Sequence, residues 1–145
     1  MRRVYRPYYS PMSTVTLDSL QFVLRCLLAV FFFGAGITHF VPVVQRTMAA
    51  MIPPGLRFTG IFGARGPVVL VMVTGVCEML GGLGLLWPPT IGVTGVMLVI
   101  FLIAIFPANA FAARDPKRFG RAAIPIRTRV VEQVVLIALV ILAIV

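Results

Sequence analysis

Residues 67–111 read PVVLVMVTGVCEMLGGLGLLWPPTIGVTGVMLVIFLIAIFPANAF, and this stretch decides the fold. Its only charged side chain is that of Glu78, so it is far more apolar than the surface of a soluble domain. Pro88 and Pro89 divide it into two apolar runs, each near the roughly 20 residues of a helix that crosses a bilayer. Because the turn between them is so short, the two helices must be adjacent and antiparallel.

The composition of the whole chain agrees with that stretch. The length of 145 residues fits one domain. Apolar residues make up 60% of the chain and charged residues 12%, whereas soluble domains have about 45–50% and about 25%. These values exclude an ordinary soluble domain, a disordered chain and a disulfide-stapled mini-protein. The apolar runs are continuous rather than alternating, which argues against a membrane β-barrel.

Hydropathy along the chain predicts an all-α integral membrane protein, an antiparallel four-helix bundle that forms a single transmembrane domain over residues 1–145. A polar tail is expected at residues 1–16. The four predicted spans cover residues 17–41, 67–87, 90–111 and 126–145. Residues 43–51, between the first two spans, predict a short helix in the membrane interface.

The charge pattern indicates membrane lipids as partners and argues against nucleic acid. The net charge is +9, from 13 basic and 4 acidic residues, and most basic residues lie outside the apolar runs. Such loops contact anionic lipid and fix the orientation of a membrane protein. The two longer loops are the more basic side. The positive-inside rule therefore predicts a multi-pass protein of the plasma membrane with both termini outside.

Three charged residues lie away from the ends of the predicted spans, and a charge near the bilayer centre costs at least about 2.5–3.5 kcal/mol. They are Arg25, Glu78 and Glu132. At about 1.5 Å of rise per residue, Arg25 and Glu78 lie about 12 and 14 Å from the terminus side, which predicts a buried ion pair between them. Glu78 is expected to face the bundle, because it shares a helical face with glycines that allow close packing. These glycines are Gly75, Gly81 and Gly82.

Other polar residues lie toward the loop side of the predicted spans. They are His39, Asn109, Arg129 and Gln133, with Glu132 beside them. With Arg25 and Glu78 they predict a polar ladder from the middle of the membrane to the loop side. Pro107 frees a backbone carbonyl next to this ladder. The ladder could pin the helix register, or it could line a ligand site or a proton path. No spacing of His, Cys and carboxylates resembles a metal site, so no metal ligand is predicted.

Four short motifs stand out: AGITHF at residues 35–40, MIPP at 51–54, GVCEMLGGLGLL at 75–86 and FPAN at 106–109. Together they resemble the DoxX family of small bacterial four-span membrane proteins. This resemblance covers the chain from about residue 24 onward. It implies an association with respiratory or redox membrane complexes and assigns no catalytic residue. The residues that match the family signature are Gly75, Glu78, Gly81, Gly82, Pro107 and Asn109.

Three functions are compatible with these observations, and whether the chain is an enzyme stays open. The first is an accessory subunit of a larger redox-linked membrane complex, favoured by the small size and the lack of a cofactor motif. The second is a quinone- or lipid-binding oxidoreductase component. In it, Glu78 or Glu132 would handle protons, and Arg25 or His39 would hold an oxygen of the head group. The third is an assembly factor for membrane proteins. Other membrane proteins or a second copy are the expected protein partners. Quinone is the one candidate cofactor, and none is expected to be intrinsic.

Overall fold

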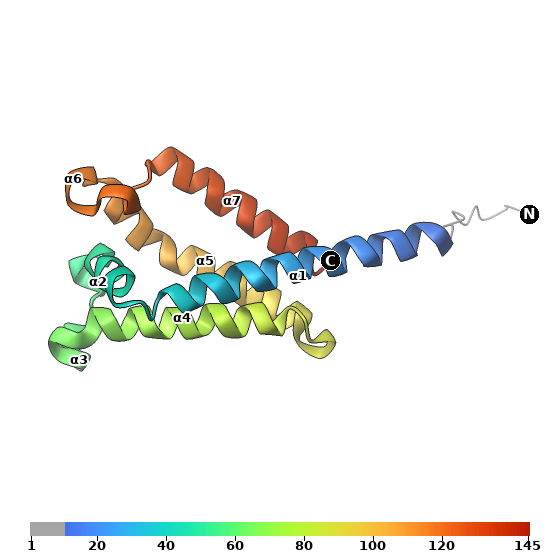
Figure 1. The fold of residues 1–145 in the computed structure, drawn as a ribbon, viewed down its shortest axis with the longest axis horizontal. Coiled ribbons are helices and arrows are strands. Elements are labelled where there is room, and N and C mark those ends of the chain that lie inside the picture. The colour runs from blue at the N-terminus through green and yellow to red at the C-terminus, as the bar shows by residue number, and fades with distance from the viewer. Residues whose placement is uncertain (1–10) are drawn as a thin grey trace, which may run out of the picture.

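The structure, a computed structural model, describes the chain from residue 11 to residue 145 and its side chains from residue 16. Within that range the chain forms helices and turns and no β-strand. The four longest helices are α1 (Pro11–Thr38), α4 (Gly66–Gly84), α5 (Ile91–Ala113) and α7 (Ile126–Leu142). Figure 1 shows α4 running along α1, and α7 running along α5.

The α1–α4 pair is antiparallel and packs unusually closely. A Cβ atom on Gly36 would lie 2.6 Å from the carbonyl oxygen of Gly75, and one on Gly82 would lie 2.8 Å from that of Ala29. Real Cβ atoms do not approach backbone this closely, so these two positions require glycine. Small residues that let backbones meet are the usual interface of membrane helices. Gly75 and Gly82 therefore pack on α1, whereas a Cβ atom on Gly81 would meet the side chain of Leu98 on α5.

A hydrophobic core joins the α1–α4 pair to the second pair, α5 and α7. Its largest fully buried side chains come from three helices or their ends: Phe32, Leu85 and Val140. The turn from α4 to α5 is the short helix η3 (Pro88–Thr90), where the hydroxyl of Thr90 donates to the carbonyl of Gly84 at 2.8 Å. The prolines therefore produce the antiparallel turn that the sequence predicts.

Short helices gather at one end of the molecule (Figure 1). They are α2 (Pro42–Met51), η1 (Pro54–Leu56), α3 (Thr59–Phe62), η2 (Gly63–Arg65), α6 (Pro116–Phe119) and η4 (Gly120–Ala122). A second small core at this end contains Met51, Ala112 and Phe119. The predicted helix at residues 43–51 is present as α2. The other short helices were not predicted.

Three stretches are long and apolar enough to cross a membrane: Thr16–Thr38, Thr59–Gly84 and Pro88–Ala113. They overlap the first three predicted spans, and the second stretch begins eight residues earlier than predicted. Many large apolar side chains on these helices are exposed, such as Val30 at 74% and Val93 at 69%, as expected of surfaces that face lipid. Residues 11–16 of the predicted polar tail are helical, as the first part of α1. The rest of that tail lies outside the described residues.

Candidate functional site: a buried histidine–glutamate pair

His39 and Glu78 form a buried polar contact between α1 and α4. The Nε2 atom of His39 lies 3.2 Å from Oε2 of Glu78. The two residues are only 8% and 7% exposed. A buried carboxylate needs a partner of this kind, because an unpaired charge in apolar surroundings costs many kcal/mol. His39 is therefore the partner of the Glu78 carboxylate by proximity, although Oε2 of Glu78 makes no hydrogen bond of regular geometry among the described residues.

The local backbone explains why the imidazole reaches α4. α1 ends at Thr38, and the amide of His39 donates to the carbonyl of Gly36 at 3.2 Å. Gly75 leaves the space that the imidazole fills, since a Cβ atom there would lie 2.7 Å from Cβ of His39. The side chain of Gln45 on α2 donates to the carbonyl of His39 at 3.1 Å. Three helices thus fix this one residue.

The other ring nitrogen of His39 is also bound. Nδ1 lies 2.9 Å from the carbonyl oxygen of Val71 and 3.1 Å from the hydroxyl of Thr74, and that hydroxyl itself donates to Val71. A carbonyl oxygen only accepts, so Nδ1 must carry a proton. Nε2 then faces Glu78. One further proton between Nε2 and Oε2 makes the pair neutral overall, whichever of the two atoms holds it.

The predicted ion pair between Arg25 and Glu78 is wrong. Nη1 of Arg25 instead donates to the carbonyl of Ala143 at 3.2 Å. The side chain of Gln21, one turn earlier on α1, donates to the carbonyl of Val145. The last carbonyls of a helix have no partner within the helix. Arg25 and Gln21 therefore bind carbonyls just past the C-terminal end of α7.

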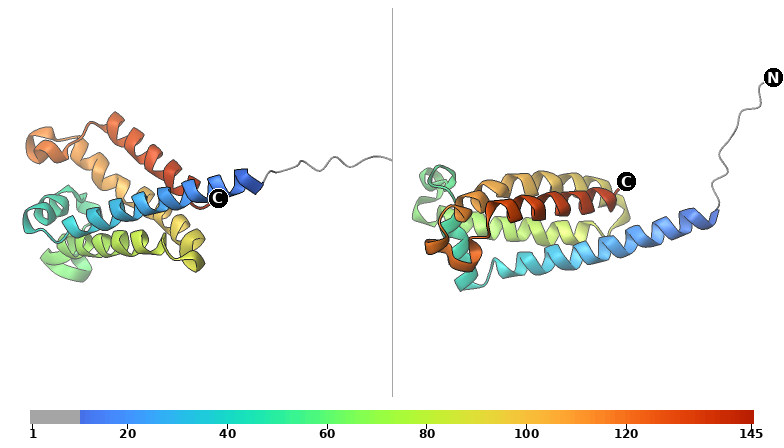
Figure 2. Two further views of the ribbon diagram at one scale, coloured as in Figure 1. Left: turned by 45° about the vertical axis from the view of Figure 1, so that its right-hand side comes forward. Right: turned by 90° about the horizontal axis from the view of Figure 1, so that it is seen from above.

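The register of the α1–α4 pair explains this correction. Ala29 packs against Gly82, so Arg25 lies level with Leu86 in an antiparallel pair. Glu78 is eight residues away from that level, or about 12 Å along the helix axis. The prediction measured depth from an expected helix start at residue 17, but α1 is longer and its N-terminal part projects beyond the other helices (Figure 2).

The predicted polar ladder is divided into separate groups. On α7, Nη1 of Arg129 lies 3.5 Å from Oε2 of Glu132, and Nη2 donates to the carbonyl of Ala122 at 3.5 Å. The side chain of Gln133 donates to the carbonyl of Leu102 on α5. Neither group contacts the His39–Glu78 pair in the part of the chain that the structure describes. The polar residues of α7 thus contact one another, the segment before α7 and the backbone of α5.

Pro107 lies inside α5 without ending it. Because proline has no N–H, the carbonyl of Ile103 loses its usual donor. The amide of Gln133 binds the neighbouring carbonyl of Leu102 instead. Asn109 is partly buried and, within residues 16–145, its side chain has no hydrogen-bond partner. The expected link between Asn109 and the other polar residues is therefore not made.

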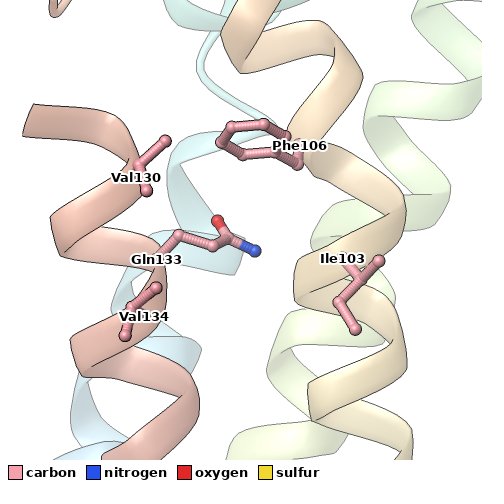
Figure 3. A pocket seen from close by; sticks show the side chains of 5 residues that line it. All are labelled: Ile103, Phe106, Val130, Gln133 and Val134. Atoms are coloured by element: carbon pink, nitrogen blue, oxygen red, sulfur yellow. The ribbon is translucent and has the colours of Figure 1, made fainter. Parts of the chain in front are cut away.

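A largely apolar groove lies between α5 and α7 beside this proline. It has a volume of about 270 Å³ and is open to the outside. Figure 3 shows the amide of Gln133 extending from α7 across the groove toward α5. The residues that line the groove are Ile103, Phe106, Val130, Gln133 and Val134. No group of three or more His, Cys, Asp and Glu side chains that could hold a metal ion occurs among residues 16–145.

Sequence reasoning missed the partners of His39. Two of these partners could have been noticed in the sequence. Thr74 is a polar residue directly before the glycines of α4, and Gly36 lies three residues before His39. The carbonyl of Val71 and the side chain of Gln45 carried none. Backbone acceptors do not appear in a sequence pattern, and Gln45 reaches His39 only because the chain turns at residues 39–41.

Three apolar stretches of spanning length, with a buried histidine–glutamate contact between the first two, are typical of a helical membrane protein. The chain belongs to the family described as "Domain of unknown function (DUF8561)", whose sequence model matches residues 28–143. The match includes His39 and Glu78 and leaves out Arg25. No curated protein and no solved structure matches the chain.

Proposed function

We propose that the protein is an accessory subunit of a larger complex in a bacterial plasma membrane, where α7 docks against a helix of a partner protein. One observation carries this proposal. The side chain of Glu132 is 50% exposed on the outer side of α7, among exposed valines. The redox character of the complex is supported by the resemblance to the DoxX family alone.

In this proposal α7 is the fourth span of a four-helix bundle. Its 17 residues rise about 25 Å, which is near the lower limit for crossing the hydrocarbon core. Four spans put both termini on one side of the membrane. The short helices α2, α3 and α6 then lie on the other side, and their basic residues favour the cytoplasm.

The position of Glu132 argues for a partner helix. Glu132 is six residues after the start of α7, about 9 Å along the helix. Without a partner its carboxylate would face lipid, and a charge costs up to about 2.5–3.5 kcal/mol as it approaches the bilayer centre. Its contact with Arg129 is long, at 3.5 Å, and Nε of Arg129 is buried without a hydrogen-bond partner among the described residues. A partner helix with polar side chains would satisfy both groups.

Native mass spectrometry of the protein, extracted gently from its own membrane, tests this function. We expect a mass that includes a second polypeptide. Glu132→Gln should reduce the fraction of bound partner by about tenfold, because a hydrogen bond to a charged group contributes about 1.5–3 kcal/mol. Asp115→Asn is the matched control. It also removes one carboxylate, but asparagine still caps α6, where Asp115 accepts from the amide of Arg118.

The same spectra distinguish a second candidate, the binding of a quinone or another amphipathic molecule in the groove between α5 and α7. The groove favours such a ligand because apolar walls surround one polar group, the amide of Gln133. A bare chain or a homo-oligomer that carries a quinone-sized mass would support this second candidate. It would overturn the accessory-subunit proposal, as would a partner that Glu132→Gln does not affect.

A further inference from the structure

The segment from Leu56 to Arg65 exposes apolar side chains next to two arginines. Leu56, Phe58, Ile61 and Phe62 are all exposed, and Ile61 is the most exposed of them at 72%. Arg57 and Arg65 lie within and at the end of the segment. Four exposed apolar side chains in seven residues are unusual on a surface that faces water. A surface of this composition fits the boundary between lipid head groups and acyl chains.

This segment does not have to lie in the hydrocarbon core for the chain to cross the membrane. α4 alone has 19 residues and rises about 28 Å, close to the thickness of the core. Gly63 separates α3 from α4 with a φ of +57°. Figure 1 shows α3 turned aside at the end of α4, next to the other short helices. The segment is therefore placed where α4 would leave the core.

The backbone of the segment is held in a strained shape. Phe58 has a φ of +49°, in the left-handed region that bulky residues rarely adopt. Two contacts support it. Nε of Arg57 donates to the carbonyl of Ile52 at 3.0 Å, and Gly66 packs so closely that a Cβ atom there would collide with the carbonyl oxygen of Arg57. The fold thus maintains a costly conformation in which Phe58 is exposed.

The charge around the segment is almost wholly positive. Residues 42–65 contain three arginines and no acid. Asp115 directly precedes α6, at the same end of the molecule. Its carboxylate accepts a hydrogen bond from the amide of Arg118. Arg65 is exposed and has no ion-pair partner among residues 16–145. Unpaired guanidinium groups bind phosphate oxygens well.

We propose that the segment Leu56–Arg65 is a docking surface for anionic phospholipid, in which the apolar side chains enter the head-group boundary and Arg65 binds a lipid phosphate. The occupant is a bilayer lipid rather than a protein. The observations that favour it are the two arginines next to the apolar side chains and the lack of any acid in residues 42–65 that could repel phosphate. This surface is independent of the face of α7 to which the partner protein is assigned.

Fluorescence quenching by brominated lipids tests the proposal in the full chain, reconstituted in bilayers. Trp87 is the only tryptophan, so Trp87→Phe gives a silent background in which Ile61→Trp reports on the segment. Brominated phosphatidylglycerol and brominated phosphatidylcholine are compared at equal mole fraction. We expect quenching by both, with phosphatidylglycerol the stronger quencher. Val93→Trp, exposed on α5 at the opposite end, should be quenched equally by both lipids.

Arg65→Gln isolates the charge. It should reduce the preference for phosphatidylglycerol by about two- to fivefold, the effect expected of one basic residue near an anionic surface. Arg121→Gln, an exposed arginine outside the segment, should leave the preference unchanged. Equal quenching by both lipids, or a preference that Arg65→Gln does not alter, would overturn the proposal. Quenching by aqueous iodide and not by lipid would also overturn the proposal, because the segment would then face water. Protection from both iodide and lipid would overturn it as well, because it would indicate a protein on this surface.

Discussion

Gly36→Ala is expected to lower the free energy of unfolding by about 3 kcal/mol, at the upper end of what overpacking usually costs. The added Cβ atom would lie 2.6 Å from the carbonyl oxygen of Gly75 and 3.1 Å from the backbone nitrogen of Met79. Neither atom can move without moving α4. Reversible unfolding in mixed micelles, followed by circular dichroism, measures the change.

Gly34→Ala is the matched control for this substitution. Gly34 lies one half-turn earlier on the same helix, and a Cβ atom there would meet nothing within 4 Å. Alanine is the better helix former by about 1 kcal/mol, so the control should be neutral or slightly stabilising. Equal effects at the two positions would contradict the close packing of α1 on α4.

Breaking the His39–Glu78 pair is expected to have the second large effect. His39→Leu leaves the carboxylate of Glu78 buried without a partner, which should cost about 3–5 kcal/mol of unfolding free energy. Glu78→Leu leaves Nε2 of His39 unsatisfied and should cost about 1–3 kcal/mol. The double variant replaces both side chains by apolar groups of similar volume. It should recover most of the lost unfolding free energy, because a buried pair is about as stable as a well-packed apolar pair.

The double-mutant cycle therefore predicts a coupling energy of about 2 kcal/mol or more between the two positions. Glu132→Leu is the control for removing a carboxylate from an apolar helix. Its side chain is 50% exposed and its contact with Arg129 is long, so the change in stability should be about 1 kcal/mol or less. Additive effects of His39→Leu and Glu78→Leu would show that the two residues do not form a pair.

The sequence predicted the helices far better than the contacts between them. Long apolar runs and the Pro88-Pro89 turn are local signals, and the structure has helices at all four predicted spans. The glycines that let α4 meet α1 are also visible in the sequence. The partner of Glu78 was not, because it depends on the register of α1 against α4. The prediction set residue 17 level with Trp87, whereas α1 projects past the end of α4 and Arg25 lies level with Leu86.

The predicted ladder failed for a related reason. Arg25 and Glu132 look alike in a hydropathy plot, as charges within apolar runs. Arg25 lies where α1 passes the end of α7, so unpaired carbonyls are its nearest acceptors. Glu132 lies on the outer side of α7. Which face of a helix meets which neighbour depends on crossing angles and side-chain fit, and periodicity along one helix does not contain that information.

Solid-state NMR of the protein in bilayers tests the contact at the centre of this account most directly. The chain has one histidine, so ¹⁵N-histidine labels His39 alone, and Glu132→Gln leaves Glu78 as the only glutamate. Strong dipolar coupling is expected between ¹⁵Nε2 of His39 and the ¹³C-labelled carboxyl carbon of Glu78, because Nε2 and Oε2 lie 3.2 Å apart. The account would be contradicted if the carboxyl carbon of Glu78 showed no coupling to His39 and instead coupled to ¹⁵N-labelled arginine. Loss of that coupling in Arg25→Lys would identify Arg25 as the partner.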